Sequence, residues 1–194
     1  MSNGNMSMGN RYDKPVVLAF AGPNGSGKTT VTRSLQVFGT YINADDLKKE
    51  YGLGDLEAAQ QSESLRNTLL DSGADFSFET VLSTERNLPL LEKAKVRGYE
   101  VQCIYVLTCD ENINVARVRA RHAAGGHDVP EDKIRARYHR ALALLPRLIG
   151  VCDKILVYDN SEKPSLIFNK DNAFSEIFPN NHWPEVKLKE LLGL

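Results

Sequence analysis

Short apolar runs alternate with longer stretches of helical periodicity along this chain. The strand-like runs cover residues 16–21, 40–42, 76–81, 101–107 and 154–158. Between them, apolar positions repeat with the spacing of an amphipathic helix over residues 55–72, 88–97, about 110–124, and from about 130 to near Pro146. This alternation is typical of an α/β fold with a mainly parallel sheet.

The last part of the chain has a different pattern. After the run at 154–158, residues 165–168 and 173–178 predict a small hairpin around 169–172, and residues 184–192 predict a closing amphipathic helix. Since no linker or internal repeat interrupts the pattern, we expect one domain over residues 14–194. Residues 1–13 are rich in Asn, Ser, Gly and Met, so we expect them to form a disordered leader.

A complete phosphate-binding loop follows the first apolar run. Residues 22–29 fit the pattern G-x-x-x-x-G-K-[ST], between a predicted strand and a predicted helix. In such loops backbone N–H groups surround phosphate oxygens, the lysine reaches the β- and γ-phosphates, and the hydroxyl of Thr29 would hold Mg²⁺. A glycine-rich turn without a ligand is the alternative, but the full motif in its proper context favours nucleotide binding. The predicted nucleotide-binding residues are Gly22, Pro23, Asn24, Gly25, Ser26, Gly27, Lys28, Thr29 and Thr30.

The composition of the chain argues against several classes of protein. The chain has 194 residues, 24 basic and 25 acidic, so its net charge of −1 argues against a dedicated nucleic-acid binder. Its three cysteines lack the spacing of a zinc site or a disulfide framework. No apolar run is long enough to span a bilayer, and no secretion signal is evident. We therefore expect a cytoplasmic protein without a membrane or nucleic-acid partner.

Two acidic residues follow neighbouring predicted strands. Asp45 follows the run at 40–42, and Glu79 lies within the run at 76–81. Ligands of such sheets bind beyond the carboxyl ends of the strands, so both are expected beside the phosphate loop. Asp45 would take the proton of an acceptor hydroxyl; in the competing interpretation Asn43, Asp45 or Asp46 simply caps the helix that follows. Glu79 would bind the substrate or a Mg²⁺-bound water, or else be an exposed acid at a strand end.

Basic residues are concentrated in the segment 117–140, which contains seven basic and three acidic residues. Two predicted helices joined by a glycine-containing loop there suggest a lid that closes over phosphates and excludes water. Arg117, Arg121 and Arg137 are the expected phosphate ligands. Arg119, Arg135 and Arg140 are instead expected on a solvated helical face.

Together these motifs resemble the zeta-toxin-like small-molecule kinases, a family with a P-loop NTPase fold. The resemblance rests on residues 22–30, Ile42-Asn43-Ala44-Asp45, Phe78-Glu79-Thr80, and the segment from Arg117 through Gly125-Gly126 to Arg137. It implies a three-layer α/β/α sandwich with a five-stranded, mainly parallel sheet in the order 2-3-1-4-5 and a helical lid.

The resemblance also implies an activity and roles for residues. Lys28 would bind phosphate, Asp45 would activate the acceptor, Glu79 and Thr80 would face the acceptor, and Arg121 and Arg137 would contact the phosphates. Arg117 and Arg121 remain interchangeable, because either can stack on the base while the other grips phosphate. ATP and Mg²⁺ would be the cofactors. Family toxins phosphorylate UDP-N-acetylglucosamine and are restrained by a small antitoxin, so both are expectations for this chain.

Two other functions compete with a kinase. The phosphate loop also resembles that of ATPases that couple hydrolysis to movement or assembly, but an L-S-G-G-Q-like signature is missing and Asp159 is followed by Asn160. A nucleotide-dependent binding module without turnover is the other alternative. A kinase would lose acceptor phosphorylation on substitution of Asp45, whereas a motor-type ATPase would be little affected.

Overall fold

The computed structural model describes residues 14–32, 37–126 and 128–194. The predicted leader and His127 lie outside these residues. Seven strands form one sheet in the order β2-β3-β1-β4-β5-β6-β7. Their bounds are β1 Val16–Ala21, β2 Thr40–Ile42, β3 Phe76–Thr80, β4 Glu100–Leu107, β5 Lys154–Asp159, β6 Ser165–Asp171 and β7 Phe174–Ile177.

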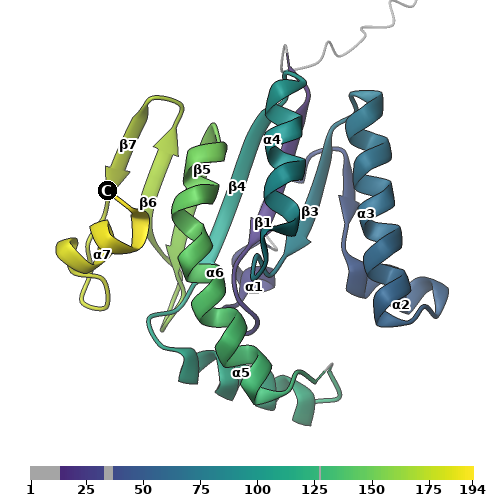
Figure 1. The fold of residues 1–194 in the computed structure, drawn as a ribbon. Helices are drawn as coiled ribbons and strands as arrows, with labels where there is room; N and C mark the ends of the chain where they lie inside the picture. Colours follow the sequence, from purple (N-terminus) through teal and green to yellow (C-terminus); the bar gives the residue numbers. More distant parts are fainter. Residues whose placement is uncertain (1–13, 33–36, 127) are drawn as a thin grey trace, which may run out of the picture.

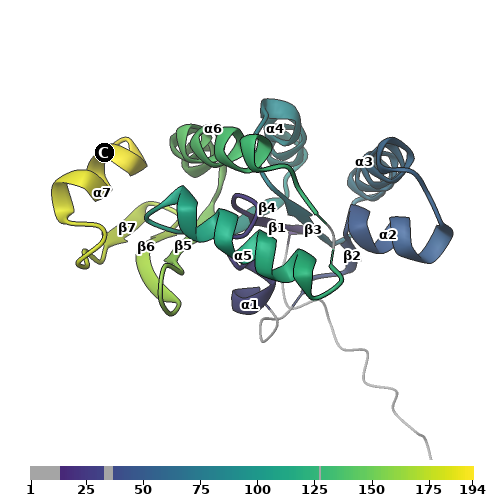
Figure 2. The same cartoon turned by 90° about the horizontal axis from the view of Figure 1, so that it is seen from below.

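Helices connect these strands. Their bounds are α1 Lys28–Thr32, α2 Ala44–Tyr51, α3 Asp55–Ser72, α4 Leu88–Val96, α5 Glu111–Ala123, α6 Glu131–Val151 and α7 Glu185–Leu192, with a short 3₁₀ turn at Glu85–Asn87. Figures 1 and 2 show α3, α4 and α6 on one face of the sheet and α1 on the other, with α5 crossing beneath the strand ends. The helices and the sheet therefore form the three layers that the sequence predicts.

The first five strands pair in parallel, in the predicted order 2-3-1-4-5. The prediction of five strands was too low, because β6 and β7 join the sheet as antiparallel strands beside β5. The hairpin turn also lies later than expected. β6 continues to Asp171, and Asn172 turns the chain with φ 54°, a left-handed conformation that asparagine tolerates better than most residues.

Helix α6 passes through Pro146 and ends only at Val151, so the predicted end near Pro146 was wrong. A proline inside a helix removes one hydrogen bond and crowds the preceding turn. The next turn of α6 nevertheless buries Leu148 and Ile149 in the main core, beneath β4 and β5. Burial of these side chains offsets the cost of the proline.

Two unequal parts of the core lie on the two faces of the sheet, and between α5 and α6 lies a third, small cluster of Val115, Val118, Val129 and Ile134. The larger lies under α3, α4, α6 and α7, and β1 contributes Val17, Ala19 and Ala21 to it. The smaller lies on the α1 face and is built on Leu18 and Phe20. Both faces of β1 are thus buried, and the carboxyl end of this central strand is held rigidly where the phosphate loop begins. Among the described helices, none is long and apolar enough to cross a membrane.

Candidate active site

The predicted phosphate loop connects β1 to α1 at the edge of the sheet where the parallel strands end. Two of its glycines are required by both conformation and space. Gly25 has φ 78°, and a Cβ atom there would lie 2.5 Å from the carbonyl oxygen of Asn114. Gly27 has φ 87°, and a Cβ atom there would lie 2.2 Å from Nδ2 of Asn160. The loop is therefore packed tightly against α5 and against the end of β5.

Two asparagines hold the backbone of this loop, a role that the sequence analysis predicted for neither of them. Buried Asn114, on α5, donates from Nδ2 to the carbonyl oxygen of Asn24 at 2.6 Å. Buried Asn160, just after β5, donates from Nδ2 to the carbonyl oxygen of Ser26 at 2.8 Å. Both bonds engage carbonyl groups of the loop and leave its N–H groups unused by these two side chains. Nothing near either asparagine in the sequence signals this role, since each contact spans about half the chain or more.

We expect Asn114→Asp to weaken both folding and nucleotide binding. The carboxylate would face the Asn24 carbonyl without a proton to donate, and a lost buried hydrogen bond costs about 1–3 kcal/mol. Thermal unfolding should show a lower melting temperature, and the Kd of a fluorescent ATP analogue should rise by about tenfold, in line with that cost. An unchanged melting temperature and Kd would show that the loop does not depend on this bond. Asn112→Asp, on the exposed side of α5, is the matched control.

Lys28 begins α1 and extends back over its own loop. Its Nζ donates to the carbonyl oxygen of Gly22 at 2.8 Å and to that of Pro23 at 3.3 Å. Burial lowers the pKa of Lys28, and the positive charge of Arg121 lowers it further, whereas the carboxylates of Glu79 and Asp45 raise it. The ammonium group is thus within electrostatic reach of a guanidinium and two carboxylates.

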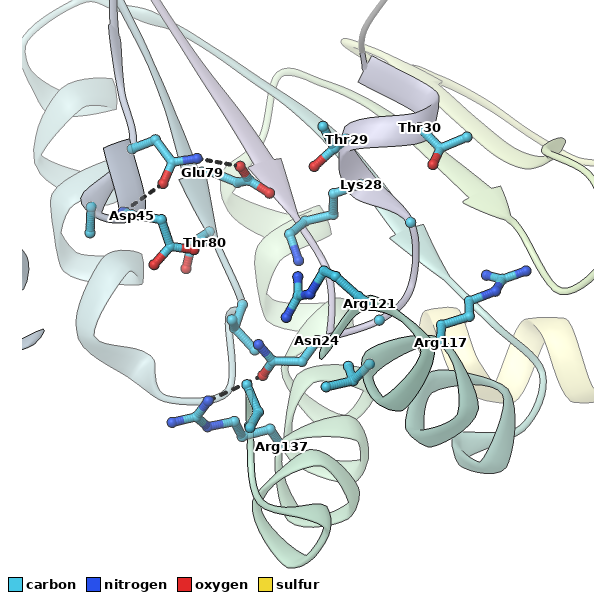
Figure 3. A pocket seen from close by; sticks show the side chains of 17 residues that line it. Asn24, Lys28, Thr29, Thr30, Asp45, Glu79, Thr80, Arg117, Arg121 and Arg137 are labelled. Atoms are coloured by element: carbon cyan, nitrogen blue, oxygen red, sulfur yellow. Dashed lines mark hydrogen bonds between the residues drawn. The ribbon is translucent and has the colours of Figure 1, made fainter. Parts of the chain in front are cut away.

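A cleft of about 540 Å³ opens beside Lys28 (Figure 3). Twelve of the predicted residues line it: Asn24, Gly25, Gly27, Lys28, Thr29, Thr30, Asp45, Glu79, Thr80, Arg117, Arg121 and Arg137. Gly22, Pro23 and Ser26 are buried in the loop and do not line the cleft. Asn43, Ala44, Val81, Val118 and Val129 line it without having been predicted to do so.

Asp45 lies in the first turn of α2, but it is not the residue that caps the helix. The cap is Asn43, whose side-chain oxygen accepts from the backbone N–H of Asp45 at 2.9 Å. The exposed carboxylate of Asp45 lines the cleft, as Figure 3 shows. Of the three residues considered as the cap of this helix, Asn43 is the one that caps it, and the side chain of Asp45 is left in place for contact with a ligand.

Glu79 and Thr80 end β3 and face the same cleft. Oε2 of Glu79 accepts from Nδ2 of Asn43 at 2.7 Å and from the Tyr41 hydroxyl at 3.1 Å. Burial, with a further contribution from the Glu79 carboxylate, raises the pKa of Tyr41 to about 12, although its bond with Asn43 acts the other way. The Tyr41 hydroxyl thus keeps its proton at neutral pH and remains a donor.

Thr80 has a different set of contacts. Its Oγ1 accepts from the backbone N–H of Leu82 at 3.0 Å and from Nδ2 of Asn87 at 2.8 Å. With both acceptor positions used, the Thr80 hydroxyl has its proton left to donate.

The three arginines that were expected to bind phosphate point in different directions. Figure 3 shows the Arg121 guanidinium beside Lys28, whereas the Arg117 side chain points away from it. Arg117 donates to the carbonyl oxygens of Ser161 at 3.0 Å and Ser26 at 3.5 Å. Arg137 reaches the loop from α6 and donates to Oδ1 of Asn24 at 3.2 Å. Of the two interchangeable arginines, Arg121 is thus the one beside Lys28.

Two other basic residues of the segment form ion pairs with acidic residues of α5 and α6. Arg119 and Arg135 both pair with Glu131, and Arg135 also pairs with Glu111 at 2.7 Å. Arg140 is exposed on α6. Within the described ranges, no cluster of three histidine, cysteine or acidic side chains could hold a metal on its own.

Known proteins are similar to this chain in sequence and in fold. The family described as Zeta toxin matches residues 5–172. An uncharacterized protein of Haemophilus influenzae is 29% identical over 125 residues, which are 61% of this chain and 89% of that protein.

Solved structures agree with this match. A structure from the PezAT chromosomal toxin–antitoxin system of Streptococcus pneumoniae has a TM-score of 0.60 at 22% identity, covering 95% of this chain and 85% of that chain. The AvrRxo1-ORF1:-ORF2 complex with ATP has a TM-score of 0.69 at 15% identity, covering 84% of this chain. The alignment spans only 60% of the length of the AvrRxo1 chain.

At these identities the structural matches establish the fold, and the family match covers most of the sequence. The resemblance inferred from the motifs is thereby confirmed: this chain belongs to the zeta toxin family.

Proposed function

We propose that this protein is an ATP-dependent kinase that transfers the γ-phosphate of ATP to a hydroxyl group of a small metabolite. The observation that carries the proposal is the composition of one cleft. It contains the phosphate-loop lysine Lys28, the guanidinium of Arg121, and the carboxylates of Asp45 and Glu79. Cations that stabilise a transferred phosphoryl group and a base for the attacking hydroxyl are what this reaction requires.

In this mechanism the cations and the base act on opposite ends of the reaction. Lys28 and Arg121 bind the β- and γ-phosphates and stabilise the negative charge that develops on the transferred group. Asp45 accepts the proton of the acceptor hydroxyl as its oxygen attacks the phosphorus in line with the departing ADP. Glu79 and the proton of Thr80 orient the acceptor. Arg137, from α6, contributes a further cation when the lid helices close.

The donor set fits Mg²⁺, which in phosphoryl-transfer sites binds one or two protein oxygens together with substrate phosphates and water. The Thr29 hydroxyl lines the cleft and would be a direct ligand. One oxygen of Glu79 is occupied by Asn43 and Tyr41, so its other oxygen would bind the ion through water. The ion would supply charge neutralisation between the phosphates.

Two finer features of the proposal rest on family membership. The acceptor is a UDP-amino sugar such as UDP-N-acetylglucosamine, and a small antitoxin protein is a partner that restrains the activity. The similar Streptococcus pneumoniae protein belongs to a toxin–antitoxin system, which supports the second feature. The location proposed for this activity is the cytoplasm.

A P-loop ATPase that couples hydrolysis to a conformational change is the alternative function. It would need an acidic residue at the end of a strand beside Thr29. The best candidate, Asp159 at the end of β5, is buried and accepts hydrogen bonds from the backbone N–H of Ser161 and from Asn180. It does not line the cleft, which favours the kinase.

The test is turnover of Mg²⁺-ATP by the purified protein, with and without UDP-N-acetylglucosamine and a panel of nucleosides and sugars, followed by mass spectrometry. We expect one acceptor to gain a phosphoryl group and to accelerate ATP consumption. ATP hydrolysis at a rate independent of every acceptor would instead favour the coupled ATPase. The absence of any turnover together with measurable ATP binding would favour a binding module.

A further inference from the structure

The backbone of Asp45 and the carboxylate of Glu79 are connected by a single side chain, that of Asn43. Asn43 lies between β2 and α2, next to the end of β3. Its Oδ1 accepts from the backbone N–H of Asp45 at 2.9 Å, and its Nδ2 donates to Oε2 of Glu79 at 2.7 Å. One amide group thus joins the helix that carries Asp45 to the strand that carries Glu79.

We propose that Asn43 is a positioning residue that holds Asp45 and Glu79 in register with each other, with the Tyr41 hydroxyl as a second donor to Glu79. This inference rests on the proposed function, in which both carboxylates face the acceptor. It adds a specific role for two residues that do not themselves carry out the chemistry.

The chemistry of the two contacts fixes the orientation of the amide. A backbone N–H can only donate and an ionised carboxylate can only accept, so the oxygen of Asn43 must face Asp45 and its nitrogen must face Glu79. Among the other good helix caps, aspartate has no proton to donate to Glu79, and serine is shorter and has one oxygen in place of the separate oxygen and nitrogen with which Asn43 reaches its two partners. Capping alone therefore does not require asparagine here, whereas simultaneous contact with the Asp45 backbone and the Glu79 carboxylate does.

Tyr41 strengthens the arrangement from the adjacent strand. Its hydroxyl lies 3.1 Å from the same oxygen of Glu79 and 3.4 Å from Nδ2 of Asn43. Its ring packs edge-on against Phe20 of the central strand, with 6.2 Å between ring centroids. The hydroxyl is thus held in place by the sheet. One oxygen of Glu79 has two fixed donors, and its other oxygen can turn toward the ligand.

Four variants separate the bridging role from helix capping. Asn43→Ala removes the cap and the bridge, whereas Asn43→Ser keeps the cap and removes the bridge. Asn43→Asp keeps the cap and places a carboxylate against Glu79. Tyr41→Phe removes only the second donor. Asp110→Ser, which changes the cap of α5 outside the cleft, is the matched control for a cap substitution.

The readouts are the melting temperature, the Kd of a fluorescent ATP analogue, and kcat for the acceptor that wild type phosphorylates in the panel. We expect Asn43→Ser to retain the wild-type melting temperature and Kd but to lose about 10–100-fold in kcat, the range for a small misplacement of reacting groups. Asn43→Asp should lose at least as much, and Tyr41→Phe about threefold to tenfold. Asp110→Ser should leave kcat unchanged.

The outcomes decide between roles. If Asn43→Ser has wild-type kcat and only Asn43→Ala is impaired, Asn43 is merely a cap and the inference is wrong. If wild type phosphorylates no acceptor, the proposed function fails, and a crystal structure of Asn43→Ser still tests the bridge. A Glu79 side chain turned away from its wild-type position would support the bridge, and an unmoved one would overturn it.

Discussion

We expect Asp45→Asn to lower phosphoryl transfer by about 10²–10⁴-fold, the contribution typical of a positioned general base. Asparagine has nearly the same shape as aspartate but cannot accept the proton of the attacking hydroxyl. Binding of ATP should be retained within about twofold, because the phosphates interact mainly with the loop, Lys28 and the arginines. The measurements are single-turnover transfer to the acceptor found in the panel and the Kd of a fluorescent ATP analogue.

The adjacent residue provides a closely matched control. Asp46 is also an exposed acid in the first turn of α2, but it does not line the cleft. Asp46→Asn makes the same change of charge near the same helix end, so it should affect helix stability equally and leave transfer intact. Equal rates for Asp45→Asn and wild type would remove Asp45 from the mechanism. Equal losses in both variants would point to a general effect on α2.

We expect Lys28→Met to lower transfer by about 10²–10³-fold and to weaken ATP binding as well. Methionine keeps much of the length of the side chain but loses the charge that stabilises the transferred phosphoryl group. The variant also gives up the two hydrogen bonds to the carbonyl oxygens of Gly22 and Pro23. Burial disfavours the charged form of Lys28, as its lowered pKa shows. Replacement of the charge by an apolar side chain is therefore not expected to destabilise the fold.

Isothermal titration calorimetry with Mg²⁺-ATP and the same transfer assay test this prediction. Lys93→Met is the matched control, since Lys93 lies on α4 and pairs with Asp71 on the surface. It should bind ATP and transfer phosphate as wild type does. Retention of full transfer by Lys28→Met would contradict the role given to the phosphate loop.

Local sequence patterns were enough to predict the parts of the site that are local in the chain. The phosphate loop is defined by eight consecutive residues, and the strand that precedes it is uniformly apolar because both of its faces are buried. The positions of Asp45 and Glu79 followed from the rule that parallel strands end at the same edge. The strand order 2-3-1-4-5 came from the family resemblance and not from the pattern itself.

The features that were missed depend on contacts between distant residues. Asn114 and Asn160 are ordinary polar residues in sequence, and only the packing of α5 and β5 against the loop gives them partners. The continuation of α6 past Pro146 depends likewise on the core that receives Leu148 and Ile149. Propensity rules describe the local cost of a proline but not the tertiary packing that offsets it.

The packing behind the phosphate loop also bears on how the protein is made. Gly22 packs against the carbonyl oxygen of Val106, Asn24 is held by Asn114, and Ser26 is held by Asn160. A nascent chain that emerges from the ribosome carries the nucleotide motif first, but the residues that shape it are synthesised 84 to 134 positions later. We therefore expect the loop to reach the conformation that binds nucleotide late in translation, after most of the chain has left the ribosome.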